Sequence, residues 1–370
     1  MTGLDETQLA PATALPEEAP PRPTRRWRPR AVTVAAFVAA AASLVGTTVV
    51  VPYYAIAPGE VVATPGLVEV VGGPSYHPEG SIHLVTVYQA HVTAYDAIRG
   101  WLDPDIDVLR EKQVLPPKTS SADLRRLNLQ LMDTSKETAM GVAFEALGYD
   151  AITGDGAEVS NVVPGSPAAT TLKVGDLITR VDSTPVDMHT DAVDALGAQE
   201  PGDRVVMRVT SKGAAPRDVA VVLARQPDDR AKPMLGVFLR TRNLRFDFPF
   251  EVKVASERIG GPSAGLAYTL EVLDRLTPGE LTGGSRVAAT GTIELDGSVG
   301  EIGGIVQKTA AVEAAGIDLF LVPRGEYVAA KHRAGRGLTV APVDDLDDAL
   351  RILARRGGNG LALGRLEVPK

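Results

Sequence analysis

The sequence predicts an α+β multidomain protein that begins with one transmembrane helix. Three observations support this prediction: a charge-free run over residues 31–51, a set of short strand patterns over 151–226, and a mixed strand and helix pattern over 235–356. A chain of 370 residues has room for two or three domains. Its 44% hydrophobic content is enough to fill separate cores.

The composition excludes several classes of function. The formal net charge is −8, which argues against a nucleic-acid partner because such partners usually require a basic face. The chain contains no cysteine, which excludes a disulfide framework, a thiolate metal site and a cysteine nucleophile.

The N-terminal segment predicts a cytoplasmic lead and a membrane anchor. Residues 1–30 are expected to be disordered, and residues 31–51 are long enough to span a bilayer as a helix. The arginines before the span are Arg22, Arg25, Arg26, Arg28 and Arg30. The positive-inside rule therefore predicts a cytoplasmic N-terminus and an extracytoplasmic remainder. The alternative is a cleaved signal peptide with the site "AIA", although Pro58 follows that motif directly.

Residues 52–150 predict a membrane-proximal α/β segment without recognisable chemistry. "SIHLVTVYQAHVTAY" alternates as a strand does, and a helix is expected to begin behind Ser121 as its N-cap. The histidines His77, His83 and His91 lack the i, i+4 spacing of a helical metal pair. We therefore expect them to be structural and expect no metal site.

Residues 151–226 show short strands separated by turn signals. "AEVSNVVPGSPAATTLKVGDLITRVDSTPV" gives a strand, a Pro-Ala turn and a Gly-Asp before an apolar strand, and a helix is expected at about 189–198. This order resembles a PDZ domain. The resemblance implies a small β-barrel with helices that binds an extended peptide along a sheet edge, with the peptide carboxylate near Gly148 and Tyr149. A PDZ domain that only packs against its neighbour is the alternative.

A polar segment at 227–234 predicts a linker before the last unit, which covers 235–356 and is followed by a tail at 357–370. This unit contains "GGPSAG", in which two glycines permit unusual backbone angles and Pro262 suits the first position of a helix. Ser263 would lie in the first helical turn, where unpaired N–H groups favour negative charge. The pattern indicates either a plain helix start or a nucleophile beside an anion hole.

Lys308 is the anomaly of the next predicted helix, which runs over 305–315 and is closed by Gly316. It shares an apolar face with Ile305 and Val312. Its amine could reach out to water while its stem covers apolar surface. Alternatively, apolar surroundings lower the pKa of the amine and make it a base, which a serine nucleophile requires. Ser-Lys pairs are a known variant of the serine triad.

"GGPSAG", followed further along by "TGTIELDGSVGEIGGIVQKTAAVEAAG", resembles the proteolytic domain of Lon-type serine peptidases. The resemblance implies a ribosomal-protein-like two-layer α/β fold, with Ser263 as nucleophile, Lys308 as base and Thr290 supporting the lysine by a hydrogen bond. Gly261 and Pro262 would shape the nucleophile loop, with backbone N–H groups for the oxyanion. ATP-dependent Lon proteases carry Asp where Gly260 stands here, which puts acidic tuning of the nucleophile in doubt.

Taken together, the anchor, the PDZ-like unit and the Lon-like unit resemble membrane-bound, PDZ-containing Lon-like peptidases of bacteria. No G-x-x-x-x-G-K-[ST] motif occurs, so no P-loop ATPase is expected. The resemblance implies an ATP-independent serine endopeptidase in the cell membrane that cleaves extended or unfolded polypeptides outside the cytoplasm. It also implies no cofactor and assembly as a hexameric ring.

Three other functions are open at this stage. The first is a membrane-tethered PDZ adaptor that has lost catalysis, against which the intact Ser263, Lys308 and Thr290 argue. The second is a small-molecule kinase whose Gly-Ser loop holds phosphate, although no second phosphate motif is present. The third is a Ser-His-Asp hydrolase, which would need His189 or His332.

Overall fold

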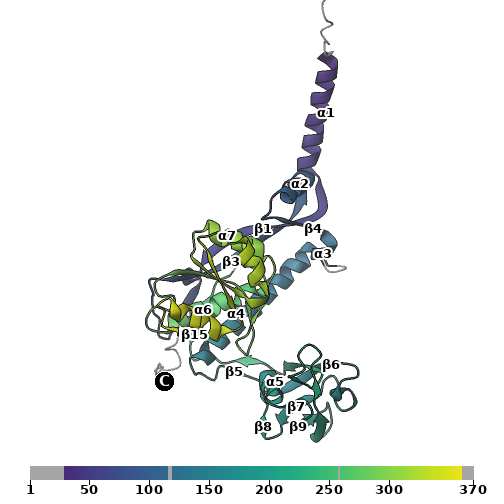
Figure 1. The fold of residues 1–370 in the computed structure, drawn as a ribbon, viewed down its shortest axis with the longest axis vertical. Coiled ribbons are helices and arrows are strands. Elements are labelled where there is room, and N and C mark those ends of the chain that lie inside the picture. Colours follow the sequence, from purple (N-terminus) through teal and green to yellow (C-terminus); the bar gives the residue numbers. More distant parts are fainter. Residues whose placement is uncertain (1–28, 116–118, 257–258, 361–370) are drawn as a thin grey trace, which may run out of the picture.

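The computed structural model describes residues 29–115, 119–256 and 259–360. Over these ranges the chain forms an N-terminal helix, a large unit and a small unit (Figure 1). The helix α1 (Pro29–Thr48) extends away from the large unit. The small unit is attached to the large one through a ribbon of two short strands, β5 (Ile152–Thr153) and β14 (Arg245–Phe246).

The predicted N-terminal lead and anchor cover residues 1–51. The lead at 1–28, with four of the five arginines, lies outside the described residues. The predicted span at 31–51 corresponds to α1 and to the first residues of β1 (Val50–Ala63), whose β-branched and aromatic residues favour a strand. None of the helices within the described ranges is both long enough and apolar enough to cross a membrane.

The large unit is built on a six-stranded mixed sheet. Its strand order is β20 (Thr339–Val343), β19 (Leu319–Pro323), β16 (Arg286–Ala289), β3 (Ser81–Thr93), β1 and β4 (Asp107–Arg110). The centre is parallel, because β16 pairs in parallel with both β3 and β19. The predicted division between 52–150 and 235–356 is therefore corrected: both segments supply strands to one sheet and form one unit.

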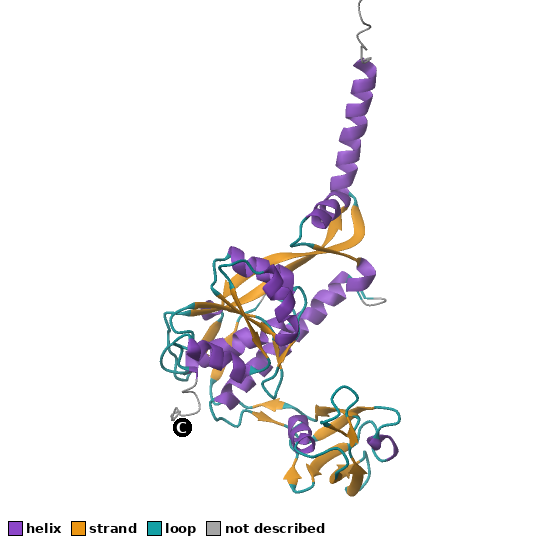
Figure 2. Ribbon diagram, in the orientation of Figure 1, coloured by secondary structure: helices purple, strands orange, loops and turns teal. Residues whose placement is uncertain are grey.

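Helices cover both faces of this sheet (Figure 2). One face packs against α4 (Ser121–Ala146), α6 (Gly265–Leu276) and α9 (Leu346–Arg355), and the other against α7 (Ile305–Ala314) and α8 (Tyr327–Arg333). Along β16, Val287 and Ala289 enter the first core and Ala288 enters the second. The predicted two-layer fold is therefore wrong: strands that are apolar on both faces need a helical layer on each side.

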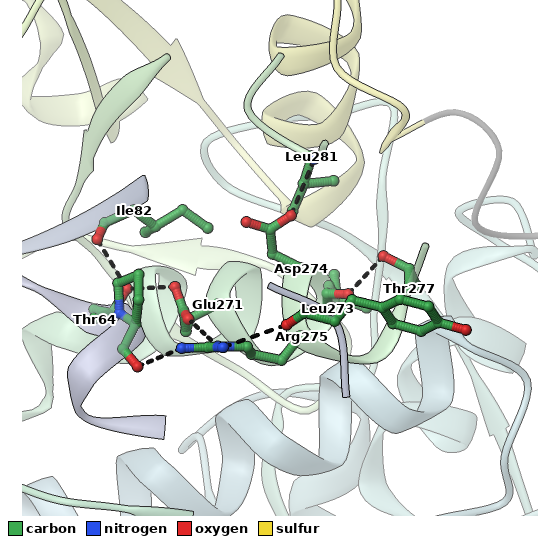
Figure 3. Close-up of polar contacts among 10 residues, drawn as sticks. Thr64, Ile82, Glu271, Leu273, Asp274, Arg275, Thr277 and Leu281 are labelled. Atoms are coloured by element: carbon green, nitrogen blue, oxygen red, sulfur yellow. Dashed lines mark hydrogen bonds and ion pairs between the residues drawn. The ribbon is translucent and has the colours of Figure 1, made fainter. Parts of the chain in front are cut away.

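A buried polar network fixes the N-terminal strands to α6 (Figure 3). The Thr64 hydroxyl, which has one hydrogen to donate, lies between two acceptors: Oγ1 is 2.7 Å from Glu271 Oε2 and 2.9 Å from the Ile82 carbonyl oxygen. Arg275 Nε donates to Glu271 Oε1 at 3.0 Å, and its Nη2 donates to the Pro65 carbonyl. Glu271 and Arg275 pair within α6, and the contacts from Thr64 and Pro65 supply further partners for these buried charges, which links residues 64–65 to α6.

The small unit has its own core and a five-stranded sheet path. The strand order is β10 (Arg217–Val222), β9 (Arg204–Thr210), β7 (Leu177–Val181), β6 (Ala157–Val162) and β13 (Val237–Thr241). The short strand β8 (Thr184–Pro185) pairs with β7, and the unit also contains the helix α5 (His189–Gly197). The helix expected at about 189–198 is confirmed. The predicted boundary at 226 is too early, because β13 pairs with β6 and its Val237 and Leu239 pack on this core.

The predicted linker at 227–234 consequently lies within the small unit, next to the pair β11 (Ala224–Arg225) and β12 (Pro233–Met234). The N-cap of α4 is Ser120 and not Ser121, whose Oγ instead lies 2.9 Å from Tyr54 Oη. The remaining elements are η1 (Thr64–Gly66), β2 (Val68–Val71), α2 (Ala94–Leu102), α3 (Glu111–Val114), η2 (Pro167–Thr170), β15 (Glu251–Val254), η3 (Pro262–Ala264), β17 (Thr292–Ile293), β18 (Val299–Gly300) and η4 (Arg324–Glu326).

Candidate active site

The "GGPSAG" segment forms a sharp loop that enters a helix. Gly261 has φ +90°, a backbone angle that suits glycine, and Pro262 opens the short helix η3 ahead of α6. A Cβ at Gly265 would lie 2.8 Å from the Ile293 backbone nitrogen, so only glycine fits there. Ser263 is half-buried in the first turn, where the sequence places it.

Lys308 points from α7 to this serine. Its Nζ lies 2.8 Å from Ser263 Oγ and 3.0 Å from Thr290 Oγ1. The lysine is only 2% exposed. The alternative in which its amine reaches water is therefore wrong, and the structure brings together the three side chains that the sequence singles out.

The surroundings of Lys308 change its acidity. Burial lowers the pKa of the amine to about 8, and the negative charge of Glu326 opposes this fall. Burial also raises the pKa of the Glu326 carboxyl, whose Oε1 accepts a hydrogen bond from the Ile302 backbone N–H at 3.2 Å. A lysine with a pKa near 8 is uncharged in about one molecule in ten at pH 7, which makes it usable as a base.

Thr290 is placed by a break between two strands. β16 ends at Ala289, and Gly291 adopts φ +146° before β17 begins. The fully buried Thr290 accepts from Lys308 Nζ and donates through Oγ1 to the Ser263 carbonyl at 3.2 Å. The Gly291 N–H donates to the same carbonyl at 3.0 Å. Thr290 thus orients the lysine and holds the serine backbone at once.

Ser263 and Lys308 open into a cavity of about 1160 Å³. Its walls come from the nucleophile loop, from the residues just before α7 and from β1 and β3, with Glu60 and Tyr88 among the side chains. Nothing in the sequence of β1 or β3 indicates a part in the chemistry. The alternation in "HLVTVYQ" predicted the strand, but nothing local indicates which loop that strand faces.

α4 makes two contacts with the nucleophile loop that the sequence does not predict. The Asn128 carbonyl accepts from the Gly261 N–H at 2.8 Å, and Ser135 Oγ donates to the Pro262 carbonyl at 3.0 Å. A Cβ at Gly260 would lie 3.1 Å from Asn128 Cβ, so the aspartate of ATP-dependent Lon proteases would crowd α4 here. Nothing in the sequence near Asn128 or Ser135 marks them, because their partner loop is more than a hundred residues away.

The predicted peptide-carboxylate site at Gly148 and Tyr149 is corrected by the structure. Gly148 follows the end of α4 with φ +85°, and the Tyr149 ring lies 5.6 Å from that of Phe144 and 6.4 Å from that of Phe250. These rings pack on the core of the large unit. The two residues therefore lie on the stalk that leads to the small unit and not on its sheet edge.

The two histidines that a Ser-His-Asp arrangement would need lie in other parts of the fold. His189 begins α5 in the small unit, with Nδ1 2.8 Å from Thr241 Oγ1, and His332 is exposed on α8. Neither is among the described residues that line the cavity, which argues against a Ser-His-Asp arrangement. His83 is buried in β3, and burial lowers its pKa. Within the described ranges no group of three or more histidine or carboxylate side chains could hold a metal ion.

Two protein-family models match the chain. The PDZ domain model matches residues 138–222, and the model of the Lon protease (S16) C-terminal proteolytic domain matches residues 254–355. Both predicted resemblances are thereby confirmed. The chain contains a PDZ domain and a Lon-type proteolytic domain, which is a serine-peptidase domain. Residues 50–137, which supply β1, β3 and most of α4, lie outside both matches.

Curated relatives match only in the proteolytic region. A Lon protease of Chloroflexus aggregans is 35% identical over 98 residues, which are 26% of this chain and 12% of that protein. Lon protease 1 of Myxococcus xanthus is 36% identical over 94 residues, which are 25% of this chain and 11% of that protein. This chain thus spans about an eighth of the length of these relatives.

Among solved structures, the PDZ domain of an SdrC-like protein from Listeria monocytogenes is 27% identical. The match covers 23% of this chain and 87% of that one, with a TM-score of 0.21.

Proposed function

We propose that this chain is an ATP-independent serine endopeptidase, with Ser263 as its nucleophile and Lys308 as the base. The observation that supports this most directly is the 2.8 Å contact between Lys308 Nζ and Ser263 Oγ inside a Lon-type proteolytic domain. The lysine is buried beside a cavity large enough for a polypeptide segment.

The proposed reaction uses the uncharged form of Lys308. Its amine takes the hydroxyl proton as Ser263 Oγ attacks the peptide carbonyl carbon, and backbone N–H groups at the start of the helix stabilise the oxyanion. The ammonium then gives its proton to the leaving amine as the C–N bond breaks. Water, deprotonated by the same amine, then attacks the acyl carbon, and the ammonium returns its proton to Ser263 Oγ as the ester C–O bond breaks. The hydrogen bond to Thr290 Oγ1 keeps the amine directed at Ser263 throughout.

The proposed substrates are extended or unfolded polypeptides. The sequence has no P-loop motif that would drive unfolding, and the nucleophile is a half-buried side chain that lines a cavity. The test is to incubate the purified full-length chain in detergent with a fluorescently labelled unstructured polypeptide, without nucleotide. Cleavage by the wild type is expected. Binding without any cleavage would instead support the catalytically inactive adaptor.

We also propose that the PDZ domain recruits the substrate. β13 is the last strand on its side of the sheet, and it lies beside α5, whose His189 N–H donates to Thr241 Oγ1 at 3.0 Å. Phe238 on this strand is 60% exposed. An extended peptide could add as a further strand along this edge.

Excision of the PDZ domain should slow the cleavage of long polypeptides more than the cleavage of short peptides. Asp155 N–H donates to the Arg242 carbonyl at 2.9 Å, so residues 155–242 can be replaced by a short turn that closes the β5–β14 ribbon. We expect kcat/KM for a long polypeptide to fall about tenfold, since remote binding energy is lost, while kcat/KM for a short peptide changes little. Equal losses for both substrates would show that the PDZ domain serves folding and not recruitment.

We further propose that residues 31–51 attach the chain to the cell membrane, with the N-terminus in the cytoplasm. Support comes from the charge-free run and the five arginines before it. The large apolar side chains of α1 are exposed, and α2, which contacts α1, exposes Ile98, Trp101 and Leu102. Such residues suit the edge of a bilayer. Assembly as a hexameric ring, which the resemblance implies, stays a prediction.

Reporter fusions test this topology. A periplasmic or extracellular reporter fused after Lys370 should be active, and a cytoplasm-only reporter at the same position should be silent. A matched fusion after Arg30, ahead of the span, should give the opposite pattern. Activity of the cytoplasmic reporter after Lys370 would reverse the orientation.

A further inference from the structure

The nucleophile loop is held from two sides. On the side of the catalytic lysine, Thr290 Oγ1 and the Gly291 N–H donate to the Ser263 carbonyl. On the other side the contacts come from α4, through the Asn128 carbonyl and the Ser135 hydroxyl. Ser135 is thus the side chain of α4 that donates a hydrogen bond directly to this loop.

The bond from Ser135 acts on one particular peptide plane. Its acceptor is the Pro262 carbonyl, which belongs to the same planar unit as the N–H of Ser263. In a trans peptide the C=O and N–H groups point in opposite directions. A hydrogen bond that draws the Pro262 carbonyl toward α4 therefore turns the Ser263 N–H away from α4.

This orientation matters for the proposed reaction. The N–H of the nucleophilic residue is a usual donor to the oxyanion, and such donors work only when they are fixed before the charge develops. The segment ahead of the plane contains Gly260 and Gly261, which restrict the backbone little. The Gly265 N–H also donates to the Pro262 carbonyl, but it belongs to the same short helix and cannot anchor the loop to the rest of the unit.

The packing around Ser135 is consistent with a fixed role. Ser135 is 6% exposed, and its Oγ would lie 3.1 Å from a Cβ placed on Gly265. Thr134, its neighbour on the same turn of α4, is exposed. Both are small hydroxyl residues on one helix, but only the buried one reaches the loop.

We infer that Ser135 is a positioning residue for catalysis: its hydrogen bond to the Pro262 carbonyl holds the Ser263 N–H in the orientation that receives the oxyanion. This inference rests on the proposed peptidase function. It extends the site to α4, which contributes no residue to the predicted dyad.

The test compares Ser135→Ala with Thr134→Ala, a matched loss of a hydroxyl from the same helix. With a short peptide substrate, Ser135→Ala should lower kcat about tenfold and leave KM within about twofold, since the variant loses the hydrogen bond that orients the donor to the oxyanion. Hydrogen exchange in the nucleophile loop should become faster in Ser135→Ala and stay as in the wild type elsewhere. Thr134→Ala should match the wild type in both measurements.

Two outcomes would overturn the inference. The first is unchanged kcat and unchanged loop exchange in Ser135→Ala. The second is a loss of kcat accompanied by faster exchange throughout the large unit, which would mean general destabilisation. If the wild type itself cleaves no polypeptide, the proposed function fails, whereas the loop exchange still decides whether Ser135 holds the loop.

Discussion

Ser263→Ala is expected to lower the turnover of an unfolded polypeptide by about 10⁴-fold or more, because the acyl-enzyme can no longer form. The substitution removes one oxygen atom from a half-buried position. The hydrogen bonds to the Ser263 backbone carbonyl do not depend on the side chain and should persist. Substrate affinity and thermal stability should therefore stay close to those of the wild type.

The measurement is the initial rate of peptide cleavage, with substrate binding followed separately by fluorescence anisotropy. Ser298→Ala, on the turn between β17 and β18, is the matched control and should retain full activity. A covalent serine-reactive phosphonate should label the wild type at Ser263 and leave Ser263→Ala unlabelled. Residual turnover within tenfold of the wild type would remove Ser263 from its proposed role.

The local parts of this site could be predicted from sequence, because they depend on residue types at short spacing. "GGPSAG" predicted a loop entering a helix. The apolar stripe marked Lys308 as unusual but left open whether its amine is buried or reaches water, and the structure shows that it is buried. The family resemblance supplied Thr290, whose two hydrogen bonds the structure shows. In each case the information lay within one helix or one motif.

The remaining features depend on pairing between distant segments. The register that joins Leu84 of β3 to Ala289 of β16 brings residues 52–150 into the catalytic unit, and no local pattern specifies that partner. The same holds for Ser135, whose role exists only because α4 packs against the nucleophile loop. β13 was assigned to the wrong unit for a related reason: the polar, proline-containing stretch before it resembles a linker in composition.

Lys308→Arg is expected to lower kcat/KM by about 10³-fold or more, although it preserves the positive charge. A guanidinium does not lose its proton in the working pH range, so it cannot accept the proton of Ser263. Lys308→Ala should be similarly impaired. Because the two groups act as a unit, the double variant with Ser263→Ala should be no worse than Ser263→Ala alone. Initial rates for the wild type and the four variants on one peptide substrate check this prediction.

The pH dependence of kcat/KM is a second test of Lys308 as the base. The uncharged amine is the reactive form, so kcat/KM should rise with pH and level off above the lowered Lys308 pKa of about 8. In the unfolded chain the lysine regains its ordinary, higher pKa. The folded state therefore binds the proton less tightly than the unfolded state does. This difference lowers the free energy of unfolding below pH 8, and the penalty shrinks as pH rises from the folded pKa of about 8 to the higher unfolded pKa.

The loss of stability caused by the buried charge distinguishes a catalytic role of Lys308 from a packing role. The lowered pKa of Lys308 corresponds to a loss of about 3 kcal/mol in the free energy of unfolding at neutral pH. Lys308→Met keeps a side chain of similar length but removes the charge. It should therefore be inactive and yet unfold at an equal or higher denaturant concentration at pH 7. A lysine retained for packing alone would show the reverse, with activity kept and stability lost. Near-wild-type activity of Lys308→Arg, or a rate independent of pH between 6 and 9, would send the search for the base elsewhere. A buried lysine that destabilises the fold is accounted for only if the reaction requires it.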